Sequence, residues 1–318
     1  IAYNKYFDPI TDDYIVGGVD QIIFGTGRGV VLNTYSNSQL FEDNNKIKRS
    51  SGNVASDKDP FVNVVSDNYA LSNFSNAIGS GKASISFDGV TVNAPIKDVF
   101  AANRPNPAST PPDMGAIENS LGERLNTIYT VKQDGTGDYT TIQAGINGVS
   151  AGDTVMVHNG IYFENVNLNQ SITLMSLNGP QLTIVDANSF GTVITMKDAN
   201  SIVLDGFTLR NGMTSGSGEK SGGLIVQGSE SDSRIVKNCI IANNEGHQGG
   251  GVYVEVGSFY NCQIVQNSAN FEGGGIFSAG SPTPYFENCL IAENNCNSGA
   301  AISNYAEIKN TTIINNIG

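Results

Sequence analysis

Val236-Lys237-Asn238-Cys239-Ile240-Ile241-Ala242-Asn243-Asn244 is the stretch that decides the fold, because the chain repeats its pattern, apolar-x-Asn-Cys-x-Ile-x-x-Asn. The final asparagines of five copies lie 33, 23, 27 and 22 residues apart. This spacing indicates a structural unit of about 22 residues, with loops inserted between some copies. The other copies occupy 259–267, 286–294, 308–316 and, in degenerate form, 203–211.

Apolar and variable positions alternate inside each copy, so the period is two and not the 3.6 of a helix. Glycine clusters such as 249–251 and 273–275 separate the copies, and a short apolar strand follows each cluster. A single coil of short strands cannot bury its own apolar edge, so repeated coils must stack. We therefore predict an all-β fold, a right-handed parallel β-helix or β-solenoid.

Stacking in register places equal positions of successive coils about 4.8 Å apart, in files along the solenoid. We interpret the cysteine position as an interior column of small hydrophobic residues, which Thr311 continues; a disulfide between adjacent coils is the alternative. The final asparagines form a second file, whose amides can bond along the stack. The predicted structural ladders are Cys239, Cys262 and Cys289, and Asn211, Asn244, Asn267, Asn294 and Asn316.

The charge and composition of the chain argue against several classes of binding partner. Among 318 residues only 15% are charged, the net charge is −13, and Asn, Ser, Thr and 37 glycines supply the polarity. Such a surface repels nucleic acid and anionic lipid, and no apolar run is long enough to span a membrane. The four cysteines include no C-x-x-C spacing, so we expect no metal site of the zinc type.

The solenoid is expected to open near Tyr129 with a short capping helix. Thr140 and Gln143 have the spacing of a capping box, and Ile142, Ile146 and Val149 share one helical face. Such a helix would cover the first coil, whose edge groups are otherwise unpaired. Short strands are expected at 154–157, 165–168, 172–174 and 193–196.

Three motifs near this opening, at 134–143, 152–155 and 160–164, resemble the N-terminal region of the pectin lyase-like β-helix superfamily. That superfamily holds pectinesterases, polysaccharide lyases and surface proteins without known activity, so the resemblance predicts the fold better than the function.

The first third of the chain resembles the C-terminal closing segment of bacterial secreted β-helix domains, on the motifs 59–63, 67–71, 75–81, 104–108 and 112–118. This resemblance implies that 1–118 is the end of a preceding β-helix domain, with 1–45 as the remnant of its solenoid. We expect a linker at 119–127 and the N-terminal coils of a second, truncated parallel β-helix at 128–318. Because the chain begins at Ile1 with no signal sequence and stops in mid-repeat, we expect a fragment of a longer protein with adjoining domains.

Catalytic motifs of the superfamily are incomplete. Gly160-Ile161-Tyr162-Phe163-Glu164 matches an early G-x-Y-x-E element of pectinesterases, which use two aspartates, an arginine and glutamines, but no later motif follows it. The stretch 19–25 faintly echoes their aspartate motif but lies upstream, in the wrong order. Gly246-His247-Gln248-Gly249 suggests the Gly-His-Gly element of polygalacturonases without the expected paired aspartates.

Lyases of this fold use a lysine or arginine base. Candidates by residue type alone are Arg210, Arg234, Lys237 and Lys309. Lys237, Tyr260, Glu287 and Lys309 share one outward position, which we interpret as a solvated ladder of mixed charge.

Ligand contacts are indicated only weakly. Tyr253 and Phe277 occupy one outward position of consecutive coils, so they should lie side by side, as a contact surface or beneath a loop. We expect no cofactor; structural calcium stays open because acidic residues adjoin in two places and flank a glycine-rich turn. These are Asp12-Asp13, Glu42-Asp43, and Asp134 with Asp138.

The sequence thus favours a non-enzymatic, adhesive, structural or glycan-contacting module that is secreted or held on a bacterial cell surface. Its partners would be polysaccharides or surface glycans. The alternative is a polysaccharide lyase or glycoside hydrolase that acts on a solenoid face.

Overall fold

The computed structural model describes residues 16–18, 21–23, 29–32, 35–36, 47–51, 54–55, 61–63, 66, 68–87, 90–214, 216, 220–280 and 282–318. The chain forms two compact units, 1–126 and 127–318. The acidic pairs Asp12-Asp13 and Glu42-Asp43, and most of the predicted solenoid remnant at 1–45, lie outside the described residues.

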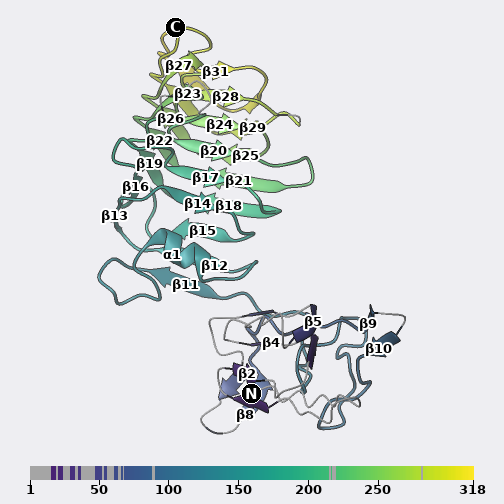
Figure 1. Ribbon diagram of the computed structural model, residues 1–318. Coiled ribbons are helices and arrows are strands. Elements are labelled where there is room, and N and C mark those ends of the chain that lie inside the picture. Colours follow the sequence, from purple (N-terminus) through teal and green to yellow (C-terminus); the bar gives the residue numbers. More distant parts are fainter. Residues whose placement is uncertain are drawn as a thin grey trace. The chain divides into compact units, whose positions relative to one another are not determined.

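The second unit is a stack of coils in which each strand pairs in parallel with the equivalent strand of the next coil (Figure 1). The all-β parallel β-helix predicted from the repeat is therefore confirmed. The eight-stranded sheet holds β11 (Ile128–Val131), β12 (Thr154–Val157), β15 (Thr173–Ser176), β18 (Ser201–Asp205), β21 (Ser233–Lys237), β25 (Ser258–Tyr260), β29 (Tyr285–Glu287) and β32 (Glu307–Lys309).

Two further sheets complete each coil. The seven-stranded sheet holds β13 (Gly160–Tyr162), β16 (Thr183–Asp186), β19 (Thr208–Arg210), β22 (Ile240–Ala242), β26 (Gln263–Val265), β30 (Leu290–Ala292) and β33 (Thr312–Ile314). The six-stranded sheet holds β14 (Val166–Leu168), β17 (Ile194–Met196), β20 (Leu224–Val226), β24 (Val252–Val254), β28 (Ile276–Ser278) and β31 (Ile302–Ser303).

A short two-stranded sheet, β23 (Glu245–Gln248) with β27 (Ser268–Glu272), lies between the seven-stranded and six-stranded sheets along the chain. In the neighbouring coils the equivalent stretch pairs only through isolated bridges, at Met213, Asn295 and Ile317.

The core follows from the period of two. Ile241, Ile264 and Ile291 are paired in register and fully buried, while variable residues fill the position before them. Phe259 and Phe286 stack inside the solenoid with ring centroids 4.5 Å apart. Each inward file thus becomes a continuous apolar column that no single coil could bury.

The asparagine ladder runs through Asn244, Asn267, Asn294 and Asn316. Oδ1 of Asn267, Asn294 and Asn316 each accepts hydrogen bonds from the backbone N–H and the side-chain amide of the ladder asparagine one coil earlier, at 2.9–3.0 Å. The side-chain amides also donate to core-strand carbonyls, as Asn267 does to Ile241 at 2.9 Å. The ladder therefore satisfies buried backbone groups at the turn after the seven-stranded sheet.

The predicted membership of Asn211 in this ladder is wrong. Leu204 pairs with Val236, so the copy at 203–211 is displaced by one residue and Gly212 takes the ladder position. The Gly212 N–H donates to Asn244 Oδ1 at 2.9 Å. Asn211 instead has a left-handed backbone, with φ of 57°, like Asn243 in the next coil.

The cysteine file is interior, as expected. Cys239, Cys262 and Cys289 are at most 4% exposed and carry free thiols, so the disulfide alternative does not occur. Thr311 continues the file, and its hydroxyl accepts a hydrogen bond from Cys289 N–H. Phe207 occupies the same position one coil before Cys239, which follows from the one-residue displacement described above.

The capping helix α1 (Ile142–Asn147) lies at the β11 end of the stack (Figure 1). Ile142 and Ile146 are fully buried and Val149 is 8% exposed, as the helical periodicity predicts. The predicted cap at Thr140 is wrong by one residue: Thr141 is the N-cap, and its hydroxyl accepts from Ala144 N–H. No helix of the described residues is long and apolar enough to cross a membrane.

The first unit contains short strand pairs. Two pairs are parallel, β3 (Gly29–Leu32) with β5 (Ile47–Ser51) and β4 (Tyr35–Ser36) with β6 (Val54–Ala55). Residues 119–126, predicted as a linker, belong to this unit; for example, Asn119 donates to Leu71 O. The antiparallel pairs are β1 (Val16–Gly18) with β2 (Gln21–Ile23), β7 (Phe61–Asn63) with β8 (Asn68–Leu71), and β9 (Ser84–Phe87) with β10 (Val90–Asn93).

Asn267→Ala should destabilise the second unit by about 3 kcal/mol, because it leaves buried N–H and C=O groups of neighbouring coils without partners. The matched control is Asn261→Ala, at an exposed corner with φ of 55°, which should cost about 1 kcal/mol through the left-handed backbone. Urea denaturation followed by circular dichroism would measure both, and equal losses would contradict a dominant role for the ladder.

Candidate functional site

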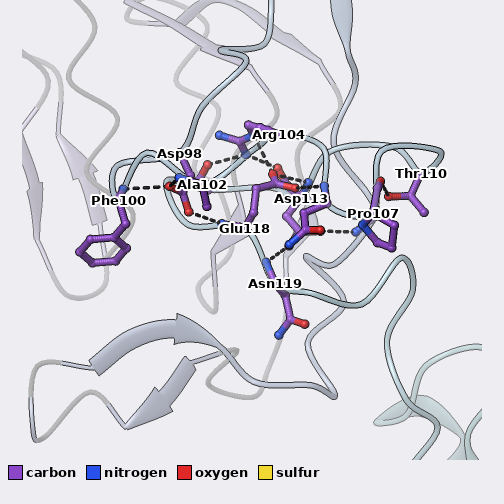
Figure 2. A network of polar contacts seen from close by, with 12 residues as sticks. Asp98, Phe100, Ala102, Arg104, Pro107, Thr110, Asp113, Glu118 and Asn119 are labelled. Carbon is purple, nitrogen blue, oxygen red and sulfur yellow. Dashed lines mark hydrogen bonds and ion pairs between the residues drawn. The ribbon is translucent and has the colours of Figure 1, made fainter.

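A network of three carboxylates and one arginine lies in the first unit (Figure 2). The Arg104 guanidinium pairs with the buried carboxylate of Glu118 at 2.7 Å and donates to two backbone carbonyls. Asp113, 3% exposed, and Asp98 lie on the same loops. Arg104, Asp113 and Glu118 belong to the motifs 104–108 and 112–118 singled out from the sequence.

Backbone N–H groups occupy the oxygens of these carboxylates. Asp113 accepts from Gly79 and Asn119 at 2.7 and 2.6 Å. Glu118 Oε2 accepts from Asn106 N–H, while its Oε1 accepts from Asp113 N–H and faces Arg104. Such carboxylates organise loops and have little capacity left to activate water. We therefore assign a structural role to this network.

Burial and backbone hydrogen bonds shift the pKa values of both aspartates in this network. Burial raises the pKa of Asp113 to about 6, against the lowering effect of the Asn119 and Gly79 N–H groups. Burial alone would also raise the pKa of Asp98, but the N–H groups of Glu118, Ala102 and Phe100 hold it below its ordinary value. The contributions of the two aspartates to stability therefore depend on pH with opposite sign.

The G-x-Y-x-E motif is also structural in this chain. Glu164 accepts from the N–H groups of Ile142 and Gln143, at 2.8 and 2.9 Å, so its carboxylate caps the first turn of α1. The Tyr162 hydroxyl is buried and donates to His158 O at 2.9 Å. The motif therefore fastens the capping helix to the coil beneath it.

The basic residues considered for lyase chemistry do not converge. Lys237 pairs with Asp205 and Lys309 with Glu287, at 3.3 and 2.9 Å, on the outward face of the eight-stranded sheet. Arg234 is 2% exposed, and burial lowers the pKa of its guanidinium. The outward file of Lys237, Tyr260, Glu287 and Lys309 is in register, as predicted for a ladder of mixed charge.

The short sheet gathers the side chains best suited to chemistry. Register places Glu245 opposite Ser268 and Gln248 opposite Glu272, with a bulge between the two pairs. Three residues along a strand span about 10 Å, so the two glutamates flank a shared stretch of surface. We call this set the short-sheet site: Glu245, His247, Gln248, Asn270, Phe271 and Glu272.

The side chains of the short-sheet site are accessible. Glu245, His247, Gln248 and Glu272 are half-buried, and Phe271 is 52% exposed. Glu245 Oε1 accepts one long hydrogen bond, 3.4 Å, from Asn270, and the Glu272 carboxylate has no partner among the described residues. His247 stacks on Phe271 with ring centroids 5.2 Å apart. In contrast to the first-unit carboxylates, these glutamates have free acceptor capacity.

Lys220 connects the short-sheet site to the neighbouring six-stranded sheet. Its carbonyl accepts from His247 N–H at 3.1 Å. Its ammonium lies 4.1 Å above the Tyr253 ring and 3.2 Å from Glu255 Oε1. Burial alone would raise the pKa of Glu255, but hydrogen bonds from Gln227 and Lys220 hold it below its ordinary value. The Glu255 carboxylate is therefore ionised and paired.

Tyr253 and Phe277 stack side by side as predicted, with centroids 5.6 Å apart and planes within 16°. They are only 8% and 7% exposed, and Lys220 covers one face of Tyr253. Because the two rings cover each other and Lys220 covers Tyr253, a sugar could contact only the ring edges. Ligand binding at this pair stays a prediction.

Sequence reasoning considered His247 only as part of an incomplete Gly-His-Gly element and gave Glu245, Glu272 and Lys220 no role. Glu245 and Glu272 share one feature in the sequence: each lies between a ladder asparagine and a glycine cluster.

Nothing among the described residues resembles a metal centre. No group of three or more His, Cys, Asp or Glu side chains converges in the part of the chain that the structure describes. The Asp134 carboxylate accepts from Thr136 within its own turn, and the Asp138 carboxylate accepts from Thr130 on β11. Structural calcium remains an untested alternative.

The known proteins to which this chain is similar carry the names of pectin-modifying enzymes. No family model matches the chain. It is 29% identical over 194 residues to a protein of Arabidopsis thaliana with the provisional name pectinesterase/pectinesterase inhibitor 38, covering 55% of this chain and 37% of that protein. The chain thus spans well under half the length of this relative.

Solved structures with similar folds are pectin methylesterases. PemA from Erwinia chrysanthemi has 17% identity and a TM-score of 0.43, covering 59% of this chain and 66% of that one. The enzyme from Aspergillus niger has 12% identity and a TM-score of 0.32, covering 59% and 85%.

These findings correct the function expected from the sequence. The matching relative belongs to an enzyme class, so the expectation of a non-enzymatic adhesive or structural module is wrong. The expectation was drawn from missing catalytic motifs, yet a motif search cannot see residues that neighbouring coils bring together. The relative is a plant protein, which gives no support to the expected bacterial source.

Glu164→Gln should lower the stability of the second unit by about 1 kcal/mol, because a neutral amide caps α1 less well than a carboxylate. Glu230→Gln, on an exposed turn, is the matched control and should be neutral. Thermal unfolding would measure both. An unchanged melting temperature for Glu164→Gln would contradict the capping role.

The stability of the first unit should fall as pH rises from about 4 to 6. The folded pKa of Asp113, about 6, lies above its unfolded value, so the folded state holds the extra proton in this window. Asp113→Asn should flatten this dependence. Urea denaturation at a series of pH values tests it, and a wild-type stability that rises across the window would contradict the assignment.

Proposed function

We propose that this chain is part of a secreted carbohydrate-active enzyme that hydrolyses esters on a pectic polysaccharide, and that the short-sheet site carries the reaction. The observation that supports this most directly is the pair of accessible glutamates beside His247, in a chain related to a pectinesterase. The polysaccharide would lie against the solenoid at the short sheet.

Ester hydrolysis needs a base for water and donors for the oxyanion. Glu245 is the preferred base, because its carboxylate accepts only one long hydrogen bond. It would take a proton from water as the water oxygen attacks the ester carbonyl. The tetrahedral intermediate then collapses, the alcohol leaves with a proton, and the acid product remains.

Donors for the oxyanion are available on the same surface. Asn270 and Gln248 carry amides, and His247 can donate an N–H. Glu272, without a partner among the described residues, is the second candidate base. The Lys220 ammonium is committed to Glu255 and Tyr253, so it would not act as a base. Lys220 would instead support the site through its carbonyl, which accepts from His247 N–H.

The competing reaction is polysaccharide cleavage by a lyase or hydrolase on the same face. The basic side chains considered for lyase chemistry are buried or in ion pairs, which favours ester hydrolysis. The end of a preceding β-helix in 1–118 remains a proposal that rests on sequence motifs.

The purified chain should release methanol or acetate from esterified pectin without shortening the polymer. Glu245→Gln should lower the rate at least tenfold, and Glu272→Gln should show whether the second carboxylate takes part. Glu230→Gln and Glu164→Gln are controls outside the site. Acid release in a pH-stat and polymer length by size-exclusion chromatography give the readouts.

New reducing ends or unsaturated products would instead assign a hydrolase or lyase. Ester hydrolysis that survives in the Glu245→Gln/Glu272→Gln double variant would place the reaction elsewhere. A folded chain with no activity on any pectic ester would contradict the proposal.

A further inference from the structure

Arg210 is held in a fixed orientation on β19, away from the short-sheet site. Its Nε donates to Asp186 Oδ2 at 2.8 Å, and the Asn211 amide binds the same carboxylate at 2.9 and 3.1 Å. Asp186 is 3% exposed and also accepts from Asn188 N–H. These bonds restrict the rotamer of the arginine.

The outer end of this guanidinium is unoccupied. Neither Nη group makes a hydrogen bond to any described residue, and the Arg210 side chain is 34% exposed. The ion pairs of Lys237 and Lys309, in contrast, use the terminal ammonium itself. A planar fork of free donors on a fixed side chain matches a carboxylate.

An exposed aromatic residue lies on the adjoining turn. Phe190 is 78% exposed, although Asn188, Ser189 and Gly191 around it have left-handed backbones, with φ of 51°, 61° and 63°. The turn runs beside Arg210 and Asn211: Ala187 N–H donates to Arg210 O, and Ser189 N–H to Asn211 O at 2.7 Å. Asn165 further binds Phe190 O at 2.7 Å. An exposed ring on so constrained a turn indicates a contact role.

We infer that Arg210 and Phe190 form an accessory subsite for an acidic sugar unit, with the sugar carboxylate on the Arg210 Nη groups and the sugar face against the Phe190 ring. Met213, 43% exposed, extends this surface toward the short sheet, because it bridges to Gly191 on one side and to Glu245 on the other. The inference deepens the proposed function, since one polysaccharide could reach both places.

Isothermal titration of the full chain with unesterified oligogalacturonate tests the subsite without relying on catalysis. Arg210→Gln and Phe190→Ala should each weaken binding about tenfold or more. Lys237→Gln is the matched control, because it removes a lysine paired with an aspartate of the adjacent coil on another face. Neutral oligosaccharides should bind more weakly than the acidic one.

Arg210→Gln leaves Asp186 buried without its cation, so the Asp186→Asn/Arg210→Gln double variant keeps the test valid if the single variant unfolds. Hydrolysis of a small soluble ester, which cannot span both places, should be unchanged in Phe190→Ala. If the wild-type chain binds the acidic oligosaccharide but hydrolyses no ester, the proposed function is contradicted and the subsite is not. Wild-type affinity in folded Phe190→Ala and in the double variant, or no binding of acidic oligosaccharide at all, would overturn the subsite.

Discussion

In-register hydrogen bonding between coils is the constraint on which the second unit depends. Every coil must present its backbone groups at the spacing of the next, and the ladder from Asn244 to Asn316 maintains that match where the chain turns after the seven-stranded sheet. An asparagine amide can donate and accept at once, so each one serves the coils on both sides. An apolar residue in place of Asn267 or Asn294 would leave buried N–H and C=O groups unpaired, at a cost comparable to a lost hydrogen bond.

This constraint also determines where function can arise. Inward files are fixed by packing, and outward files on the eight-stranded sheet fill with solvated ion pairs such as Lys309 with Glu287. Variation remains between the fixed positions of a coil. The short sheet lies between the ladder asparagine and the glycine cluster, and the register of β23 with β27 places Glu245 and Glu272 on adjacent strands without disturbing the ladder. The turn that carries Phe190 lies at the same edge, joined to it through the Gly191–Met213 and Met213–Glu245 bridges.

The sequence predicted the fold well because in-register pairing between coils requires the same residue types at the same positions of each repeat. The strand at 154–157, the interior cysteines and the buried face of the helix follow from periodicity alone. The copy at 203–211 was displaced by one residue because Phe207 and Gly212 stand where later copies have Cys and Asn, so the pattern offered no anchor. The candidate site was missed for a different reason. Its members come from separate coils and share no motif, and only the register of β23 against β27 brings them together.

Acceptor capacity separates the carboxylates of this protein into two kinds. Asp113, Glu118 and Glu164 sit in stretches that resemble family motifs, yet backbone N–H groups or a guanidinium occupy their oxygens, so those motifs preserve loops and a helix cap. Glu245 and Glu272 belong to no motif and keep free oxygens. A carboxylate must give up bound hydrogen bonds before it can accept a proton from water, so the second kind is better placed for chemistry. In this solenoid the matched motifs therefore indicate the fold, and carboxylates with free hydrogen-bonding capacity indicate where a reaction can take place.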